Sequence, residues 1–319
     1  MAIDPDLWPV LASTFGLFLA VGFFAQLVDG AVGMAYGVIS SSVLLAFGVP
    51  PAQVSATTHA AECFTTGASA ASHMAHRNID WKLFFRLAPA GVVGGAIGAY
   101  LLTGFDATFI KAVVIAYLGV LGLVMLVRAL SPPREEPPHL RHVIPLGVVG
   151  GFLDASGGGG WGPIVTSTLL GRGHPPRYVI GSVNSAEFVV TVAISITFIW
   201  TMMTGRLELE GGLAVGSAAL AGLILGGVAA APLAGFVTKI APARLLLGGA
   251  SVLVIGLSIW QGVQLWPRLS EYTIVGDTTV AEAVDLLRAE IVERPFLWLG
   301  GALTAGAAAV LLWINRNRF

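Results

Sequence analysis

Residues 28–66 of this chain recur at 153–191, which places the two copies 125 positions apart (154 − 29 = 125). The copies align without a gap, and 14 of the 39 aligned positions are identical. Each copy contains an Asp before a Gly-rich run, then a Pro pair, then a Glu. The matched residues are Asp29 with Asp154, Pro50 and Pro51 with Pro175 and Pro176, and Glu62 with Glu187. An internal repeat with Gly-interrupted apolar segments is typical of secondary transporters, and the interruptions point to the binding site.

Composition limits what such a repeat can form. Hydrophobic residues make up 55% of the 319 and charged residues only 11%, whereas a soluble domain carries about 25% charge. The charges fall between apolar runs of roughly 15–25 residues, the length that spans a hydrocarbon core. Because backbone groups in lipid must pair internally and no alternating strand pattern occurs, we predict an all-α polytopic membrane protein embedded in the lipid bilayer.

Charge and cysteine content exclude other classes. The net charge of −1 does not suggest a nucleic-acid partner. The single Cys63 rules out a disulfide framework and argues against a cysteine metal site. We therefore expect no metal and no other cofactor.

The apolar segments fall into two halves of five, separated by a Pro-rich charged linker. Residues 8–130 form transmembrane repeat 1, 131–142 the cytoplasmic linker and 143–265 transmembrane repeat 2. Residues 266–294 form an acidic extracytoplasmic insert with an expected amphipathic helix, and 295–319 form a C-terminal transmembrane helix and basic tail. The predicted segments are 8–28, 32–48, 54–74, 85–103, 109–130, 142–156, 158–171, 179–203, 211–236, 243–265 and 295–315.

Loop charges predict the orientation. The Lys- and Arg-bearing loops all lie on one side if the N-terminus is outside and the C-terminus is cytoplasmic. Because five segments is an odd number, the two repeats are then inverted relative to each other. Segments 142–156 and 158–171 are short for full crossings. We predict helical hairpins or broken helices whose Gly-rich tips reach the midplane of the plasma membrane.

The glycine runs are candidate anion-binding sites. Internal glycines weaken a helix by about 1 kcal/mol each and leave backbone N–H groups that can bind an anion at a half-helix N-terminus. The candidate substrate ligands of this kind are Ser156, Gly157, Gly158, Gly159 and Gly160, with Gly33 in the first repeat. Gly94, Gly95, Gly226 and Gly227 are better explained as positions of close helix packing.

Polar side chains follow in the third segment of each half. Thr57, Thr58 and His59 align with a stretch that contains Asn184 and Ser185. Hydroxyl, amide and imidazole groups can donate to an oxyanion without a permanent charge. They could instead bond to neighbouring helices, as polar residues in membranes often do.

Two acids and two caps complete the candidate site. Glu62 and Glu187 are intramembrane carboxyls, which are costly and by default functional. Each either braces the facing Gly loop by accepting its N–H groups or carries a proton. Glu62 is the better proton candidate because His59 lies three residues away, on the same helix face. Asp29 and Asp154 are interpreted as hairpin caps.

Three of these motifs resemble the sulfite exporter TauE/SafE family. They are 156–163 (Ser-Gly-Gly-Gly-Gly-Trp-Gly-Pro), 181–188 (Gly-Ser-Val-Asn-Ser-Ala-Glu-Phe) and 55–62 (Ser-Ala-Thr-Thr-His-Ala-Ala-Glu). The resemblance extends over about 10–265. It implies a secondary transporter of small sulfur-containing anions such as sulfite, thiosulfate, sulfoacetate or another organosulfonate. The first repeat departs from the family pattern in having fewer glycines, and the region after 265 is an addition.

The leading hypothesis is an anion transporter that works by alternating access and is coupled to protons. We expect the second repeat to supply the backbone anion cradle and the first to supply protonation. A passive anion channel, or a permease for another small carboxylate or oxyanion, could use the same donors. An enzyme is not expected, because no catalytic constellation is present. The sequence does not predict the oligomeric state.

Overall fold

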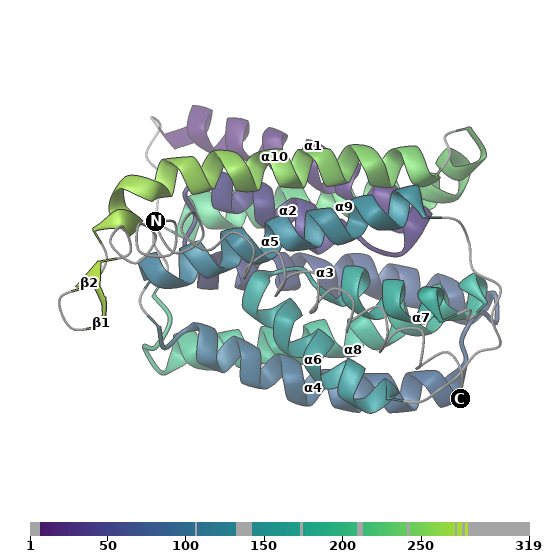
Figure 1. Ribbon diagram of the computed structural model, residues 1–319. Helices are drawn as coiled ribbons and strands as arrows, with labels where there is room; N and C mark the ends of the chain where they lie inside the picture. The colour runs from purple at the N-terminus through teal and green to yellow at the C-terminus, as the bar shows by residue number, and fades with distance from the viewer. Residues whose placement is uncertain are drawn as a thin grey trace, which may run out of the picture. The chain divides into compact units, whose positions relative to one another are not determined.

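The computed structural model describes residues 7–105, 107–131, 142–172, 175–208, 213–240, 243–271, 273–275 and 278–279. Helices account for nearly all of these residues (Figure 1). By length and composition, six of the described helices could cross a membrane. The expected helical architecture of a polytopic membrane protein is thereby confirmed.

The described helices follow the predicted segments in both halves. The first half contains α1 (Trp8–Val32), α2 (Tyr36–Ala46), α3 (Pro51–Ala75), α4 (Trp81–Leu102) and α5 (Ala107–Leu130). The second half contains α6 (Val143–Gly157), the π-helical turn η2 (Gly162–Thr166), α7 (Ser167–Gly171), α8 (Pro176–Met203), α9 (Leu213–Ile240) and α10 (Ala243–Ser270). In both halves the first helix breaks at a glycine and is followed by a shorter helical element.

Local sequence signals set several helix starts. Pro51 and Pro176 occupy the first positions of α3 and α8, where the missing N–H costs nothing and the fixed φ suits a helix. Asp80 caps α4, since its carboxylate accepts the N–H groups of Lys82 and Leu83 at 2.9 and 3.2 Å, which satisfies two otherwise unpaired donors.

The two halves pack against each other through two equivalent helix pairs (Figure 1). The first helix of each half packs on the fourth helix of the other, so that α1 meets α9 and α6 meets α4. Glycines make both contacts close. A Cβ added at Gly22 of α1 would lie 2.5 Å from Leu223 O in α9, and one at Gly98 of α4 would lie 2.5 Å from Phe152 O in α6. The packing interpretation of Gly94 and Gly226 is supported in the same way, because a Cβ there would overlap backbone of the neighbouring helix.

The predicted boundary between the second repeat and the acidic insert, at residue 265, falls within helix α10. The helix continues to Ser270. A second compact unit starts at Gln264 and includes two short antiparallel strands, β1 (Thr273–Val275) and β2 (Thr278–Thr279). The sequence did not predict these strands. The linker residues 132–141, the amphipathic pattern expected after 279 and the final helix expected at 295–315 lie outside the described residues.

Candidate functional site

Two helix breaks with the same local geometry form the centre of the candidate site. Gly33 (φ 73°) caps the C-terminus of helix α1 and Gly158 (φ 70°) caps that of α6, both in the left-handed conformation. The N–H of each glycine donates to a carbonyl four residues earlier, from Gly33 to Asp29 O at 2.5 Å and from Gly158 to Asp154 O at 2.8 Å. Glycine is the usual residue for this helix cap because it lacks a Cβ. The sequence repeat is therefore also a repeat of backbone conformation.

An aspartate side chain closes each break. Asp154 Oδ1 accepts the N–H groups of Gly160 and Trp161 at 2.7 and 3.0 Å. At the equivalent place in the first half, Asp29 Oδ1 accepts the N–H of Tyr36 at 3.4 Å. Each carboxylate thus reaches from the end of one helix to the backbone where the chain resumes.

The predicted anion cradle is occupied by this aspartate. Gly157 lies within α6, and the N–H groups of Gly158 and Gly160 both bond to Asp154. Ser156 Oγ donates to Phe152 O at 2.7 Å, within its own helix. In this conformation two of the expected donors are already engaged, the N–H of Gly158 by the Asp154 carbonyl and the N–H of Gly160 by the Asp154 carboxylate.

The two breaks pack directly against each other. A Cβ added at Gly37 would lie 2.8 Å from Gly159 Cα, and one at Gly162 would lie 2.7 Å from Met34 Cα. Gly37 and Gly162 are equivalent in the repeat, as are Met34 and Gly159. Glycine at these positions therefore lets the two chain segments touch through their backbones.

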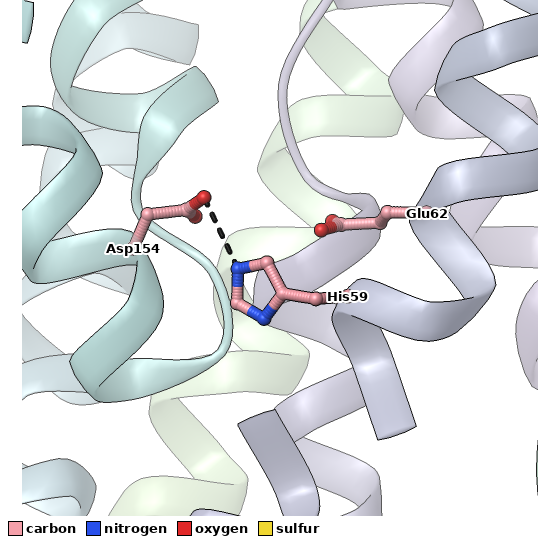
Figure 2. Close-up of side chains that lie close together, drawn as sticks. All are labelled: His59, Glu62 and Asp154. Atoms are coloured by element: carbon pink, nitrogen blue, oxygen red, sulfur yellow. Dashed lines mark hydrogen bonds and ion pairs between the residues drawn. The ribbon is translucent and has the colours of Figure 1, made fainter. Parts of the chain in front are cut away.

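His59 joins the first half to the second-half aspartate (Figure 2). Its Nε2 lies 3.2 Å from Asp154 Oδ2, and both side chains are buried. Its Nδ1 lies 2.7 Å from Ser55 O. A backbone carbonyl only accepts, so His59 Nδ1 donates to Ser55 O while Nε2 faces the Asp154 carboxylate. His59 therefore links α3 of the first half to the break that follows α6.

Glu62 points toward this pair (Figure 2). It is 2% exposed, and its Oε2 has no hydrogen-bond partner. In the second half, Asp154 accepts the N–H groups of the Gly-rich loop, which is the bracing role that we considered for the glutamates. One ligand atom from each of His59, Glu62 and Asp154 lies within 4.8 Å of the other two, a spacing that fits a metal ion.

Four buried carboxyl groups share one small cavity. Asp29, Glu62, Asp154 and Glu187 line a space of about 10 Å³ together with the glycines of both breaks. This volume is about that of one water-sized probe. The imidazole of His59 is the nearest basic group recorded at this centre. An intramembrane cluster of this kind is expensive unless protons or another cation compensate the charge.

The remaining predicted residues divide into two groups. Thr58 Oγ1 lies 3.0 Å from Ser41 Oγ, and Ser41 also donates to Gly158 O, so Thr58 belongs to the centre. Asn184 instead donates to Ser69 Oγ at 3.0 Å, and Ser185 donates to a carbonyl of its own helix at 2.7 Å. Neither lines the small cavity.

Sequence reasoning missed several polar groups at the centre. Ser55 Oγ donates to Ala155 O at 2.5 Å, and Ser41 bonds the end of α6. Tyr36 lines the cavity, and Tyr117 OH is buried near Gly160. The run of three serines at 40–42 in a short apolar segment was the one available signal.

Thr57 lies apart from the centre and lines a larger cavity of about 660 Å³. Its repeat equivalent, Ser182, is fully buried. Ser182 Oγ accepts the N–H of Asp80 at 2.8 Å and lies 3.3 Å from Asp80 O. Arg177 also donates to Asn78 Oδ1 and to a carbonyl at residue 76. The α3–α4 turn therefore covers the start of α8, whereas the start of α3 borders a cavity.

Known proteins are similar to this chain in sequence. Residues 18–260 match the family described as Sulfite exporter TauE/SafE. The "Probable membrane transporter protein YtnM" of Bacillus subtilis (strain 168) is 39% identical over 248 residues, which cover 75% of this chain and 80% of that protein. No solved structure matches the chain. The match includes both helix breaks and the carboxyl centre, and the chain belongs to the sulfite exporter TauE/SafE family of membrane transporters.

Proposed function

We propose that this protein is a secondary transporter that moves small sulfur-containing anions across the plasma membrane by alternating access, coupled to protons. The substrate class includes sulfite, thiosulfate, sulfoacetate and other organosulfonates. The observation that carries the proposal is the direct packing of two equivalent helix breaks at a buried centre of four carboxyl groups and His59. Transporters place substrate and ion sites at such breaks, near the midplane and between two repeats.

The two repeats are inverted in the membrane in this proposal. Their packing supports a two-fold relation, because α1 meets α9 just as α6 meets α4. The loops that carry Arg77 and Lys82, Arg172 and Arg177 fall on one side if the N-terminus is outside. The turn at 48–50 and Glu208 then face the outside, and the C-terminus is cytoplasmic.

Unequal access to the two halves supports alternating access. The cavity beside Thr57 lies at the end of α2 and at the starts of α1, α3 and α9, on the outer side in this orientation. The equivalent Ser182 is sealed by Asp80 on the cytoplasmic side. The structure then corresponds to an outward-facing state, and exchanging these two environments would produce the inward-facing one.

Protons have a physical reason to accompany the anion. Four carboxyl groups at the centre would repel an anion if they were all charged, and protonation removes that repulsion. Several titratable groups surround Glu62. They are His59 on the same helix, Asp154 on α6, Glu187 on α8, Asp29 on α1 and Tyr36 on α2. A proton added to this group would lower the cost of bringing an anion near the Gly-rich tips.

Flux into proteoliposomes tests the proposal. We expect labelled sulfite or sulfoacetate to enter protein-containing vesicles faster than empty ones, with acceleration by a pH gradient. Glu62→Gln should abolish gradient-driven flux and spare counterflow exchange. Glu208→Gln, which changes an exposed carboxyl, serves as the matched control and should change neither.

The outcomes separate the alternatives. Uptake no faster than in empty vesicles would reject transport of these anions. Ohmic single-channel current without saturable counterflow would indicate a passive anion channel. Loss of both gradient-driven flux and exchange in Glu62→Gln would show that Glu62 is a structural brace. Inhibition of wild-type flux by EDTA would indicate that a metal ion compensates the carboxyl centre in place of protons.

A further inference from the structure

Three buried side chains that can ligate a metal ion meet where the two halves join (Figure 2). His59 and Glu62 lie one turn apart on α3, and Asp154 lies near the end of α6. All three are at most 2% exposed. A buried carboxylate is stable when it is paired or coordinates a metal, yet Glu62 Oε2 has no hydrogen-bond partner within the protein. This oxygen is therefore available to a cation.

We propose that His59 Nε2, Asp154 Oδ2 and one oxygen of Glu62 bind a single divalent transition-metal ion, with Zn²⁺ as the representative. An imidazole and two carboxylates form a donor set that zinc accepts, and the two carboxylates balance the charge of the ion. The sequence did not suggest this site, because metal motifs are recognised by short spacings and His59 and Asp154 are 95 positions apart.

Hydrogen bonds orient His59 and Asp154 as they orient the ligands of a metal site. His59 Nδ1 donates to Ser55 O at 2.7 Å, which leaves Nε2 directed toward Asp154. Asp154 Oδ1 accepts the N–H groups of Gly160 and Trp161, which leaves Oδ2 for the ion. Metal-bound histidines and carboxylates are held by outer hydrogen bonds of this kind.

The distances fit one small ion. Two ligands with bonds of about 2.0–2.1 Å to a tetrahedral zinc ion lie roughly 3.3 Å apart, and His59 Nε2 lies 3.2 Å from Asp154 Oδ2. The Glu62 ligand atom lies within 4.8 Å of the other two. Because no hydrogen bond holds Glu62 Oε2, rotation of this side chain can close the wider gap. The adjoining cavity of about 10 Å³ is about the volume of one probe sphere, so it suits a single ion.

A bound ion would tie the two halves of the protein together. Two of its ligands come from α3 of the first repeat and the third from α6 of the second. Rocking of one repeat against the other would then have to break a bond to the ion. We therefore expect Zn²⁺ to hold the conformation described here and to inhibit transport, a consequence that rests on the proposed function. The ion and the coupling proton are alternative occupants of one centre.

Zinc binding to the purified, EDTA-treated full-length protein tests the site. Isothermal titration calorimetry should show one Zn²⁺ bound per chain. His59→Gln should lower the affinity more than about 100-fold, since loss of an outer hydrogen-bond partner alone costs roughly 10–100-fold. His76→Gln removes an exposed histidine at the end of α3 and is the matched control, with unchanged affinity. Equal affinity in wild type and His59→Gln, or loss of binding in His76→Gln, would overturn the inference.

X-ray absorption of the wild-type zinc complex tests the ligands without any substitution. We expect one imidazole nitrogen and otherwise oxygen ligands, at about 2.0–2.2 Å from the ion. Two or more imidazoles would instead place the ion at surface histidines, and a sulfur ligand would place it at Cys63. Either result would overturn the assignment, even if His59→Gln failed to fold.

Flux measurements separate this inference from the proposed function. Zn²⁺ should slow sulfite flux into proteoliposomes, and EDTA should restore it, equally in wild type and His76→Gln. Flux that saturating Zn²⁺ leaves unchanged, or that EDTA lowers, would overturn the inhibitory role. Normal flux by a protein that binds no Zn²⁺ would reject the metal site and leave transport standing. Absence of flux for every anion, with Zn²⁺ binding that His59→Gln removes, would reject transport and support the metal site.

Discussion

Replacing Asp154 by Asn would separate the charge of this residue from its structural role. Asp154 accepts three contacts, from Gly160 N, Trp161 N and His59 Nε2 at 2.7, 3.0 and 3.2 Å. An Asn side chain keeps the oxygen that accepts the two backbone N–H groups. Its amide nitrogen can donate to a neutral His59 ring, so the bonds survive while the carboxylate charge is lost.

The expected cost follows from these bonds. A hydrogen bond to a charged group contributes about 1 kcal/mol more than a neutral one. Losing the charge at three bonds should therefore lower the free energy of unfolding by about 3 kcal/mol. Asp154→Ala removes all three bonds and should cost about 5–9 kcal/mol, which approaches the entire stability of a typical protein.

Thermal unfolding in detergent and flux in proteoliposomes are the two measurements. We expect Asp154→Asn to fold with a modestly lowered midpoint, to lose gradient-driven uptake and to keep exchange. Asp29→Asn is the matched control from the other repeat, because Asp29 Oδ1 accepts Tyr36 N at the longer distance of 3.4 Å and Asn184 occupies the position equivalent to His59. It should lower stability less and retain coupling.

Two results would refute this reasoning. Gradient-driven uptake by Asp154→Asn at the wild-type rate would show that the His59–Asp154 pair does not carry the coupling proton. An equal loss of coupling in Asp29→Asn would show that the coupling proton is not confined to the His59–Asp154 pair.

Two further substitutions test the packing and the seal. Gly98→Ala should lower the free energy of unfolding by about 1–3 kcal/mol, because its Cβ overlaps α6. Gly16→Ala is the control, since a Cβ at Gly16 meets no atom within 4 Å. Gly181→Ala places a Cβ against the α3–α4 turn and should open the cytoplasmic seal. In a Cys63→Ser background, a cysteine at Ser182 should then react faster with a membrane-impermeant thiol reagent applied to the cytoplasmic side, and an unchanged rate would contradict the assigned seal.

Local chemistry was sufficient to predict the helices and their breaks. Gly33 and Gly158 end helices because glycine adopts the left-handed conformation without a Cβ clash, and Pro51 and Pro176 begin them because proline suits the first helical position. These effects act within one turn of chain, so they can be read from neighbouring residues. Hydropathy likewise depends on local composition, which is why the predicted segments match the described helices closely.

Only the tertiary structure determined which polar groups meet. Asp154 and His59 are 95 positions apart, and their contact depends on how the two halves pack. His59 and Asn184 occupy equivalent positions in the repeat, so the sequence predicted the same role for both. In the structure His59 contacts Asp154 of the other half, whereas Asn184 bonds to Ser69.

The sequence alone determined the repeat, the helical membrane architecture and the family, since each of these is written in periodicity, composition and motif. Only the structure showed that Asp154 accepts an N–H group of the Gly-rich tip. It also showed that Thr57 borders a cavity, whereas the equivalent Ser182 is buried against Asp80. Two similar stretches of sequence can differ in this way because hydrogen bonding and access depend on the surrounding helices, and those helices are not the same in the two halves.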